Sequence, residues 1–372
     1  MKMNNRRTEK IVTGICRLIL ALTFVFSGFV KSVDPWGTAL KVDEYLSIYG
    51  VESVAGTAWS MGFSIWLCGA ELMMGLMLLF KVRIRLISIF ALLSMIFFTL
   101  LTFLSATWIP VEDCGCFGDA VKLTPWQTFA KNALLLPMAW QVWRHYRPDR
   151  IFAFRRTEVL LTLLFFCTAM GVGIYSYRHL PLLDFLPYRV GVNIADAMNE
   201  DVQQPESIPE TVLVYRNLKT GRTRRFSLDD KEWQDASKWE WVDTYTVDET
   251  PSMRPTVAEF AVRDVEGDAT MDILRRPGRV MMFCMADVEQ LGVRCRERIA
   301  AAVSKGVSEG ALCVVLTSRP LHDVTWYDFG GCEVRAYNVD ASTLKTMLRA
   351  RDGVVVLDNG TIVKKLNCRD IK

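Results

Sequence analysis

Long apolar runs fill the first half of the 372-residue chain, whereas the second half has the polarity of a water-soluble protein. Five runs approach or reach the roughly 17–25 residues that a helix needs to cross a bilayer. They cover about residues 11–30, 61–80, 84–108, 125–143 and 157–176, and the fourth is the most polar. The first run exceeds a usual signal-peptide core and no small-residue cleavage site follows it, so we expect it to stay as a span.

The connections between these runs are alternately basic and acidic. The N-terminus and the connections at 81–85 and 144–156 are basic, and the connections after the first and third runs are acidic. Because short basic loops stay in the cytoplasm, we expect a cytoplasmic N-terminus. Everything from about residue 177 onward should then lie outside. This predicts a multi-pass protein of a bacterial inner (cytoplasmic) membrane with a periplasmic C-terminal domain.

The acidic loop between the third and fourth runs contains two closely spaced cysteines. Residues 111–119 read Val-Glu-Asp-Cys-Gly-Cys-Phe-Gly-Asp. A disulfide between Cys114 and Cys116 requires a tight bend, which Gly115 permits, and such a strained bond exchanges readily. We therefore interpret the pair as the candidate catalytic residues of a thiol–disulfide oxidoreductase. A static disulfide, two free thiols and half of a metal site are the alternatives, and the absence of a nearby histidine disfavours the metal.

Ionisable residues inside apolar runs are costly and usually have a partner or a function. Glu71 lies in the second run at a depth similar to Arg17 in the first, so an ion pair is expected, with proton handling beside a quinone as the alternative. Lys131, in the fourth run, is expected to hold the bundle together or to contact a bound head group. These three are the candidate cofactor-binding residues. Lys31, at the end of the first run, is expected to extend outward to the membrane surface, and residues 38–49 to form an interfacial amphipathic helix.

The N-terminal part resembles a known family. Arg17, Ser27-Gly28, Lys31, the sequence Asp-Pro-Trp-Gly at 34–37 and Glu-Leu-Met-Met-Gly at 71–75 resemble DoxX-type membrane proteins. Cys-Gly-Cys-Phe-Gly at 114–118 resembles more narrowly the MauE branch, the methylamine-utilisation protein and its relatives. The resemblance covers roughly residues 11–145. It implies a four-helix bundle that takes part in redox and disulfide chemistry outside the cytoplasm, analogous to quinone-linked disulfide-generating membrane proteins. The fifth span is additional.

The polar half begins with residues 177–210, which read as a polar tether, and continues with a hairpin formed by 211–216 and 222–228. From Gly278 onward strands and helices alternate. We expect strands at 279–285, 311–318 and 332–337, helices at 288–304 and 342–349, and a loop or short helix at 321–329. A final hairpin joins 353–357 to 361–366 across Asp358-Asn359-Gly360. This order of strands and helices, together with the preceding residues 253–275, resembles a thioredoxin-like domain.

The cysteine pair of that domain type is missing. Residues 285–290, where a Cys-x-x-Cys would start the helix, read Met-Ala-Asp-Val-Glu-Gln, so we expect a thioredoxin-like fold without its dithiol site. Cys284 falls on the strand expected at 279–285, and Cys295 falls inside the helix expected at 288–304. Both are interpreted as packing residues, and an unusual chemical role is the alternative. Cys313 and Cys332 read as core residues of strands. Cys368 is expected to be a free or intermolecular thiol.

The sequence thus predicts a membrane α-helical bundle (residues 1–150), a fifth span (151–180), a linker with a β-hairpin (181–252) and a degenerate thioredoxin-like α/β domain (253–372). The first functional hypothesis is thiol–disulfide exchange with an extracytoplasmic partner protein. The alternatives are a non-catalytic membrane scaffold whose outer domain binds a partner, and a transporter or small-molecule binder using Glu71 and Arg17. A net charge of +3 without a basic stripe excludes nucleic acid as a partner.

Overall fold

The computed structural model describes residues 2–48, 58–108, 115–121, 123–146, 156–203, 210–217, 223–227, 238–247, 257 and 260–371. The chain divides into two compact units. One comprises Met1–Ala195 with Phe260–Lys372, and the other comprises Asp196–Glu259. The first unit contains the helical bundle and the C-terminal mixed sheet, and it carries every candidate site residue.

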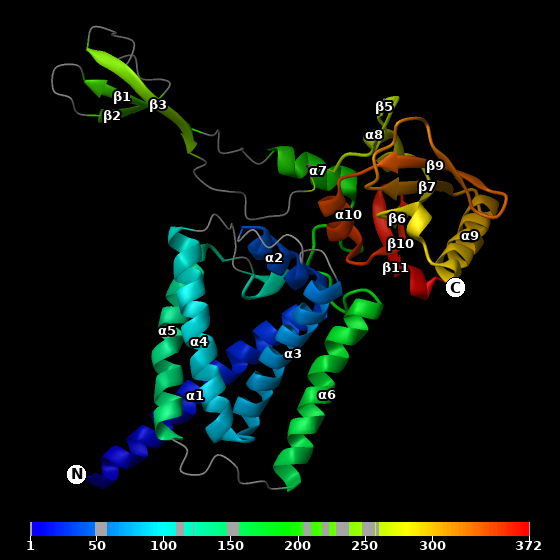
Figure 1. Cartoon of the computed structure of the whole chain (residues 1–372). Helices are drawn as coiled ribbons and strands as arrows, with labels where there is room; N and C mark the ends of the chain where they lie inside the picture. The colour runs from blue at the N-terminus through cyan, green and yellow to red at the C-terminus, as the bar shows by residue number, and fades with distance from the viewer. Residues whose placement is uncertain are drawn as a thin grey trace. The chain divides into compact units, whose positions relative to one another are not determined.

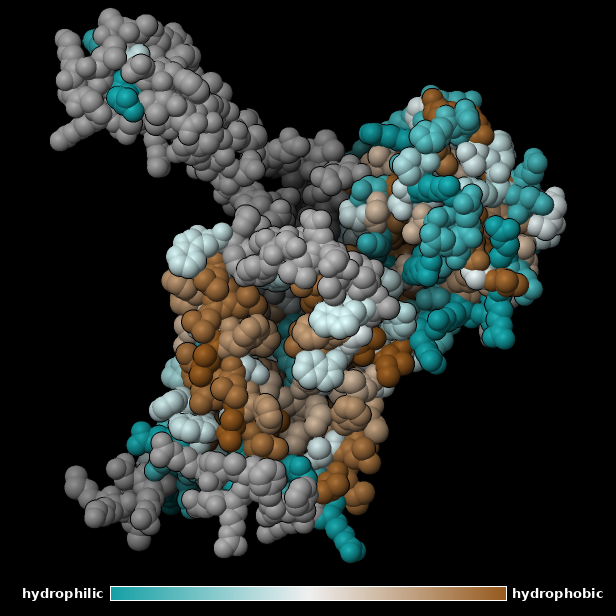
Figure 2. All heavy atoms as spheres, viewed as in Figure 1, coloured by the Kyte–Doolittle hydropathy of each residue, from teal (hydrophilic) through white to brown (hydrophobic). Residues whose placement is uncertain are grey.

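Six helices form the N-terminal part of the first unit (Figure 1): α1 (Lys2–Val33), α2 (Pro35–Ile48), α3 (Ala58–Phe80), α4 (Ile84–Thr107), α5 (Pro125–His145) and α6 (Arg156–Arg178). Of these, α1, α3, α4 and α6 are long and apolar enough to cross a membrane. On the face seen in Figure 2, apolar side chains cover much of this bundle. Large apolar residues such as Phe97, Leu100 and Leu164 are exposed. Four such helices indicate a multi-pass membrane protein.

Helix α5 corresponds to the fourth predicted run, and it is more polar than the four spans. A capping box formed by Thr124 and Gln127 starts it, and Pro125 occupies its first position. It packs against α4 and α1. The buried Asn132 side chain donates to the carbonyl of Phe98 at 3.4 Å and to the Thr102 hydroxyl at 3.3 Å, which satisfies a polar group within the bundle.

Helices α1 and α3 approach each other through two glycines. A Cβ atom at Gly28 would overlap the backbone of Leu72, and one at Gly75 would overlap the backbone of Val25. Small residues allow such contact between helices in a membrane, where packing rather than the hydrophobic effect holds helices together. This close approach brings the end of α1 directly against the middle of α3.

The second unit contains a three-stranded antiparallel sheet in the order β2-β1-β3. Its strands are β1 (Glu210–Asn217), β2 (Thr223–Ser227) and β3 (Trp239–Val247). The first two form the predicted hairpin, with Leu213 opposite Phe226. The third strand begins at Trp239, in the tryptophan-rich stretch that follows the hairpin in the sequence.

The C-terminal part of the first unit is an eight-stranded mixed sheet in the order β11-β10-β6-β7-β9-β4-β5, with β8 paired to β9. Strands β6, β7 and β9 are parallel, and β10 is antiparallel to both β6 and β11. The elements are β4 (Arg263–Asp264), β5 (Gly267–Asp268), α8 (Thr270–Leu274), β6 (Arg279–Met285), α9 (Val293–Ser308), β7 (Leu312–Thr317), β8 (Trp326–Asp328), β9 (Glu333–Asn338), α10 (Ala341–Leu348), β10 (Asp352–Asp358) and β11 (Thr361–Asn367).

Three segments differ from the predictions. The helix expected at 288–304 is a short 3₁₀ helix at Val288–Gln290 followed by α9, which begins only at Val293. Residues 321–329, expected as a loop or short helix, contain the edge strand β8, which is too short to show an alternating pattern. Residues 179–195, expected within a free tether, pack on the sheet. Gly191 donates to the Ile362 carbonyl at 2.7 Å, and Ile362 donates back to Val192 at 2.8 Å. Helix α7 (Ile194–Gln203) then follows with Ile194 fully buried.

Candidate functional site

The Cys-Gly-Cys loop is held against the end of α1. The Ser27 hydroxyl of α1 donates a hydrogen bond to the carbonyl of Cys116. Gly115 and Gly118 both have left-handed backbone angles, with φ of 58° and 53°, and the Gly118 amide donates to the Gly115 carbonyl at 3.1 Å. Residues 115–118 therefore form a tight turn after Gly115, and the predicted bend between Cys114 and Cys116 includes a residue outside the described ones. The half-buried Cys116 thiol is free among the described residues, and Cys114 lies outside them.

Two aromatic contacts surround the residue after Cys116. The Phe117 ring lies edge-on to Phe26 of α1, with centroids 5.4 Å apart. The Lys131 ammonium of α5 lies 4.1 Å from the Phe117 centroid, a cation–π contact. The structure thus places Lys131, a predicted cofactor residue, in contact with Phe117 of the Cys-Gly-Cys loop.

A buried ion pair lies next to this loop. The Lys31 ammonium of α1 is 2.8 Å from the Glu71 carboxylate of α3, and their side chains are only 9% and 8% exposed. Lys31 also lies 5.7 Å from the Phe98 centroid. The expectation that Lys31 extends outward is wrong, because the glycine contact between α1 and α3 places it opposite a buried carboxylate. Breaking such a pair by removing one partner leaves an uncompensated charge in an apolar environment.

The predicted partner of Glu71 was Arg17, and this prediction is wrong. Arg17 donates to the carbonyls of Leu78 and Leu79 at 2.6 and 2.8 Å. These carbonyls belong to the last turn of α3, where helix carbonyls lack partners and a cation is favourable. Arg17 lies about 21 Å along α1 from Lys31, at 1.5 Å per residue. Arg17 and Glu71 therefore have separate partners at different positions along α1.

The Lys31 ammonium lies within electrostatic range of two cysteines, Cys116 and Cys68. It interacts electrostatically with both of them as well as with Glu71. Cys68 is fully buried in α3, and its thiol lies 3.5 Å from the Thr38 hydroxyl of α2. The Lys31–Glu71 pair and Cys116 thus lie at the same end of α1, where Ser27 holds the carbonyl of Cys116.

Arg349 is a site residue that sequence reasoning missed. It follows α10 in a left-handed conformation, with φ of 52°, and it is 4% exposed. Its guanidinium lies 2.6 Å from Asp119 and 3.0 Å from Asp34. Asp34 also caps α2 by accepting from the Gly37 amide at 3.1 Å. Burial raises the pKa of the Asp34 carboxyl, and the Arg349 charge partly offsets this effect.

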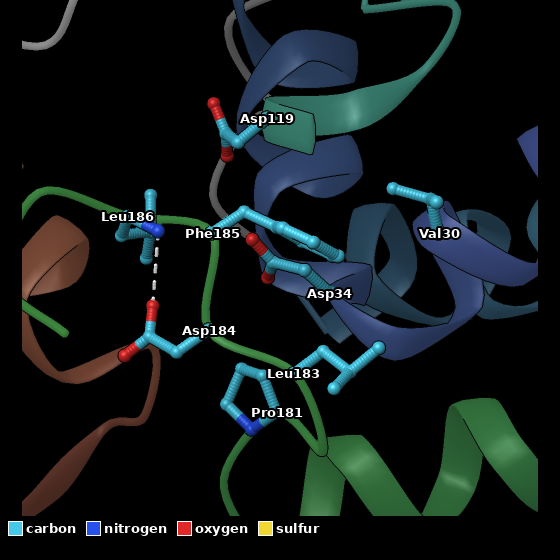
Figure 3. A pocket seen from close by; sticks show the side chains of 8 residues that line it. All are labelled: Val30, Asp34, Asp119, Pro181, Leu183, Asp184, Phe185 and Leu186. Atoms are coloured by element: carbon cyan, nitrogen blue, oxygen red, sulfur yellow. Dashed lines mark hydrogen bonds between the residues drawn. The ribbon is translucent and has the colours of Figure 1, made fainter. Parts of the chain in front are cut away.

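A small pocket lies beside these carboxylates (Figure 3). It is lined by Val30, Asp34, Asp119 and the segment at 181–186, in which the Leu186 amide donates to Asp184 at 3.1 Å. Its volume of about 10 Å³ suits one water molecule and no larger ligand. Asp184 also accepts from Lys365 of β11 at 2.6 Å, so the segment after α6 is fixed to the C-terminal sheet.

The other cysteines of the C-terminal domain differ sharply from one another. Cys368, expected as a free or intermolecular thiol, forms a disulfide with Cys295. The sequence separation of 73 residues hides this pairing. Cys284 and Cys313 are buried in β6 and β7, as predicted for packing residues, and burial raises the pKa of their thiols to about 12 and about 11. Cys332 is a half-buried free thiol.

Family comparisons agree with the bundle geometry. Residues 9–144 match the family described as methylamine utilisation protein MauE, and residues 209–248 match a domain of unknown function, DUF8463. No curated protein and no solved structure matches the chain. The first match covers α1 to α5 and includes Cys116, Lys31 and Glu71. Together with the four apolar helices, it supports a multi-pass, MauE-like membrane protein.

Proposed function

We propose that the protein is a membrane thiol–disulfide oxidoreductase that uses Cys114 and Cys116 to act on an extracytoplasmic partner protein. The observation that carries this proposal is the position of Cys116 beside the buried Lys31–Glu71 pair, with its carbonyl held by Ser27. The ion pair is retained inside the bundle at a cost in desolvation, and Lys31 lies four residues, about one helical turn, from the Ser27 that holds the loop.

The proposed reaction is an exchange in two steps. A thiolate of the partner attacks one sulfur of the Cys114–Cys116 disulfide, and the other loop cysteine leaves as a thiolate. The partner's second thiolate then attacks the mixed disulfide and releases the first loop cysteine. The leaving thiolates take up protons from water. One dithiol is thereby oxidised and one disulfide is reduced, and the reverse sequence uses a partner disulfide to oxidise the loop.

The proposal includes a topology. The contacts of Arg349 with Asp119 and Asp34 support placing the loop, α2 and the C-terminal domain in the same compartment. The basic connections at 81–85 and 144–156 indicate that the other side is the cytoplasm. The compartment is then the periplasm of a bacterium, where disulfides form and persist.

We also propose a thioredoxin-like core for the C-terminal domain. The units β6–α9–β7 and α10–β10–β11, the strand order β11-β10-β6-β7 and the antiparallel β10 support it. Met285–Gln290, between β6 and α9, contains no cysteine. The domain would therefore bind or position the partner rather than repeat the chemistry of the loop.

The direct test is the redox state of the pair in intact cells. Differential alkylation of Cys114 and Cys116, with and without added reductant, should show a mixture of oxidised and reduced forms. The double variant Cys114→Ser/Cys116→Ser should shift the thiols of a trapped partner protein, whereas the control Cys167→Ser, at an exposed position of α6, should not. A pair that is always reduced, or a double variant with wild-type behaviour, would refute the proposal.

A scaffold without redox chemistry is the second candidate. It is favoured by the absence of cysteine in Met285–Gln290 and by the buried Arg349 anchor. A scaffold would keep its function in the cysteine double variant and lose it when Arg349→Ala disturbs the C-terminal domain. The exchange proposal requires that the cysteine variant fail even when partner binding is unchanged, so the two candidates give opposite results.

A further inference from the structure

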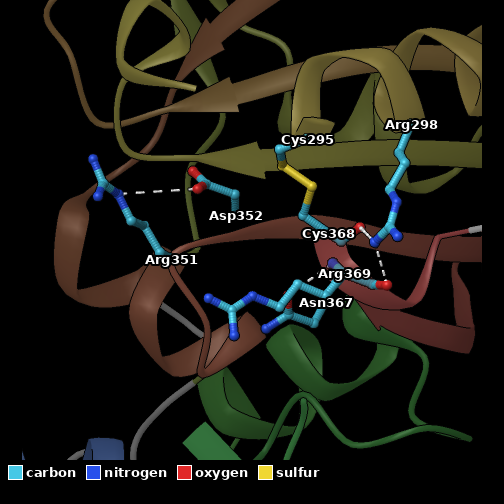
Figure 4. Close-up of a disulfide and its surroundings, with 7 residues drawn as sticks. All are labelled: Cys295, Arg298, Arg351, Asp352, Asn367, Cys368 and Arg369. Carbon is cyan, nitrogen blue, oxygen red and sulfur yellow. Dashed lines mark hydrogen bonds and ion pairs between the residues drawn. A yellow bond between two sulfur atoms is a disulfide. The ribbon is translucent and has the colours of Figure 1, made fainter. Parts of the chain in front are cut away.

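The disulfide between Cys295 and Cys368 joins the first turn of α9 to the end of the described chain (Figure 4). Cys295 is the third residue of α9, and Cys368 begins the short 3₁₀ helix η5 (Cys368–Asp370) after β11. Their Cα atoms are 5.7 Å apart, within the usual range for disulfides. The bond lies in the C-terminal domain and belongs to a cysteine pair distinct from the Cys-Gly-Cys loop.

The two sulfurs differ in accessibility. The bond borders an open surface groove of about 670 Å³, to which Arg294, Arg298 and Arg369 contribute their side chains. Cys295 is half-buried, whereas Cys368 is 5% exposed. A thiolate entering the groove would therefore reach the Cys295 sulfur first, and Cys368 would be the leaving group. An unequal pair of this kind is suited to exchange, because one sulfur is attacked and the other leaves as a thiolate.

Positive charge lies beside the Cys295 sulfur. The first turn of α9 has no acidic residue, and the dipole of the helix favours an anion at this end. Arg298 donates to the carbonyls of Cys368 and Arg369, which keeps its guanidinium beside the bond. Cys284 and Cys313 show the opposite case, in which burial raises the pKa of the thiol.

We propose that Cys295–Cys368 is a second exchangeable disulfide, whose substrate is a protein dithiol presented on an acidic surface. A substrate thiolate attacks the Cys295 sulfur, the bond to Cys368 breaks, and Cys368 leaves as a thiolate and takes a proton from water. The second substrate thiolate attacks the mixed disulfide and releases Cys295, which is protonated in turn. The substrate loses two electrons as it forms a disulfide, and the pair gains them. The arginine-lined groove selects the acidic substrate through charge.

The test uses the full-length protein in detergent and glutathione, an anionic thiol, as the probe. Alkylation and mass spectrometry read the Cys295 and Cys368 peptides separately from those of Cys114 and Cys116, so failure of one pair is distinguished from failure of the other. We expect reduction of the native protein without denaturant. The variant Arg294→Glu/Arg369→Glu should react with glutathione about tenfold more slowly, and nearly unchanged with neutral 2-mercaptoethanol.

The matched control is Arg276→Glu, which reverses an exposed charge before β6 and should react at the wild-type rate. Reduction that occurs only after unfolding would show a static structural bond and overturn the proposal. Equal glutathione rates in the wild type and the double variant would overturn the selection of acidic substrates. A rate loss of the same size with 2-mercaptoethanol would do so too, because it would show a general disturbance of the bond.

Discussion

The guanidinium of Arg349 lies 2.6 Å from the carboxylate of Asp119, and 230 residues separate the two in the sequence. Asp119 follows Cys116 by three positions, and Arg349 ends the helix that leads into β10. The contact ties the segment that follows the Cys-Gly-Cys loop to the C-terminal sheet through buried charge. A rearrangement of the loop backbone must therefore either carry Arg349 along or break its ion pairs.

Replacing Arg349 with alanine should loosen the attachment of the C-terminal domain. Asp34 and Asp119 would be left without their partner, and Asp34 is largely enclosed, with 13% of its side chain exposed. Loss of one partner of a buried pair costs about 3 kcal/mol. We expect a lower thermal unfolding temperature for the purified protein in detergent, and faster proteolysis between α6 and α7.

The control for this substitution is Arg351→Ala. Arg351 is 63% exposed and lies 3.9 Å from Asp352, so its removal should cost well under 1 kcal/mol, as for surface pairs in general. Equal unfolding temperatures for the two variants would contradict the role assigned to Arg349.

The Lys31–Glu71 pair should show strong coupling between its members. Lys31→Met and Glu71→Gln each leave one charge or polar group buried without its partner, and each should cost about 3 kcal/mol. The double variant should cost less than the sum, because no lone charge remains. Thermal unfolding of the four proteins in detergent measures this cycle, and additive effects would argue against a buried pair.

Lys31→Met should also slow the alkylation of Cys116, because it removes the cation that interacts with that sulfur. The rate at Cys167, an exposed thiol of α6, provides the internal control within the same protein sample. An unchanged ratio of the two rates would remove the main support for a reactive Cys116.

The close contact of α1 and α3 can be tested with two glycines of one helix. Gly28→Ala places a Cβ against the backbone of Leu72, whereas a Cβ at Gly14 meets nothing within 4 Å. Overpacking should cost Gly28→Ala about 1–3 kcal/mol. Gly14→Ala should be neutral or stabilising by up to about 1 kcal/mol, because alanine favours the helix. Equal stability of the two variants would contradict the observed packing.

Local patterns in the sequence sufficed for much of the C-terminal domain. Strand β6 has its predicted bounds. The Asp358-Asn359-Gly360 turn joins β10 to β11 as expected, with left-handed angles at both Asn359 and Gly360. These features depend on residues close together in the chain, where alternation and turn chemistry are visible. The apolar runs likewise predicted α1, α3, α4 and α6, because bilayer thickness fixes the length of a span, whereas the run at 125–143 forms α5, which is not among the four helices apolar enough to cross a membrane.

Such local patterns could not predict which side chains pair when they are far apart in the sequence. Glu71 was matched to Arg17 by its expected depth, and its actual pairing with Lys31 depends on the glycine contact between α1 and α3. Arg349 carries no signal before folding, because an arginine after a helix is ordinarily solvated. The partner of Cys295 could not be deduced, since spacing alone does not determine disulfide connectivity.

Helix α10 positions Arg349. The first turn of this helix is capped by Asp340, whose carboxyl group titrates. The Asp340 carboxylate accepts from the Ser342 hydroxyl and from the amides of Ser342 and Thr343. These hydrogen bonds lower the pKa of Asp340 below its ordinary value, and the one from the Ser342 side chain has the largest effect. The stabilisation is therefore complete above the unfolded pKa of about 3.9. It is lost as the pH falls through the lower folded value.

Asp340→Ala should accordingly lower stability by about 1 kcal/mol at neutral pH, the usual worth of an N-cap. The difference from the wild type should shrink as the pH falls below about 3.9, because the wild-type carboxylate then becomes protonated. Asparagine caps helices about as well as aspartate but does not titrate, so Asp340→Asn should remain close to the wild type at neutral pH and lack this acid-dependent loss. The unfolding temperatures of the three proteins, measured from pH 7 to pH 3, test this prediction.

A difference in unfolding temperature between the wild type and Asp340→Ala that stays constant on acidification would contradict it. The cap would then act through packing rather than through its charge, and α10 would hold Arg349 in place independently of pH.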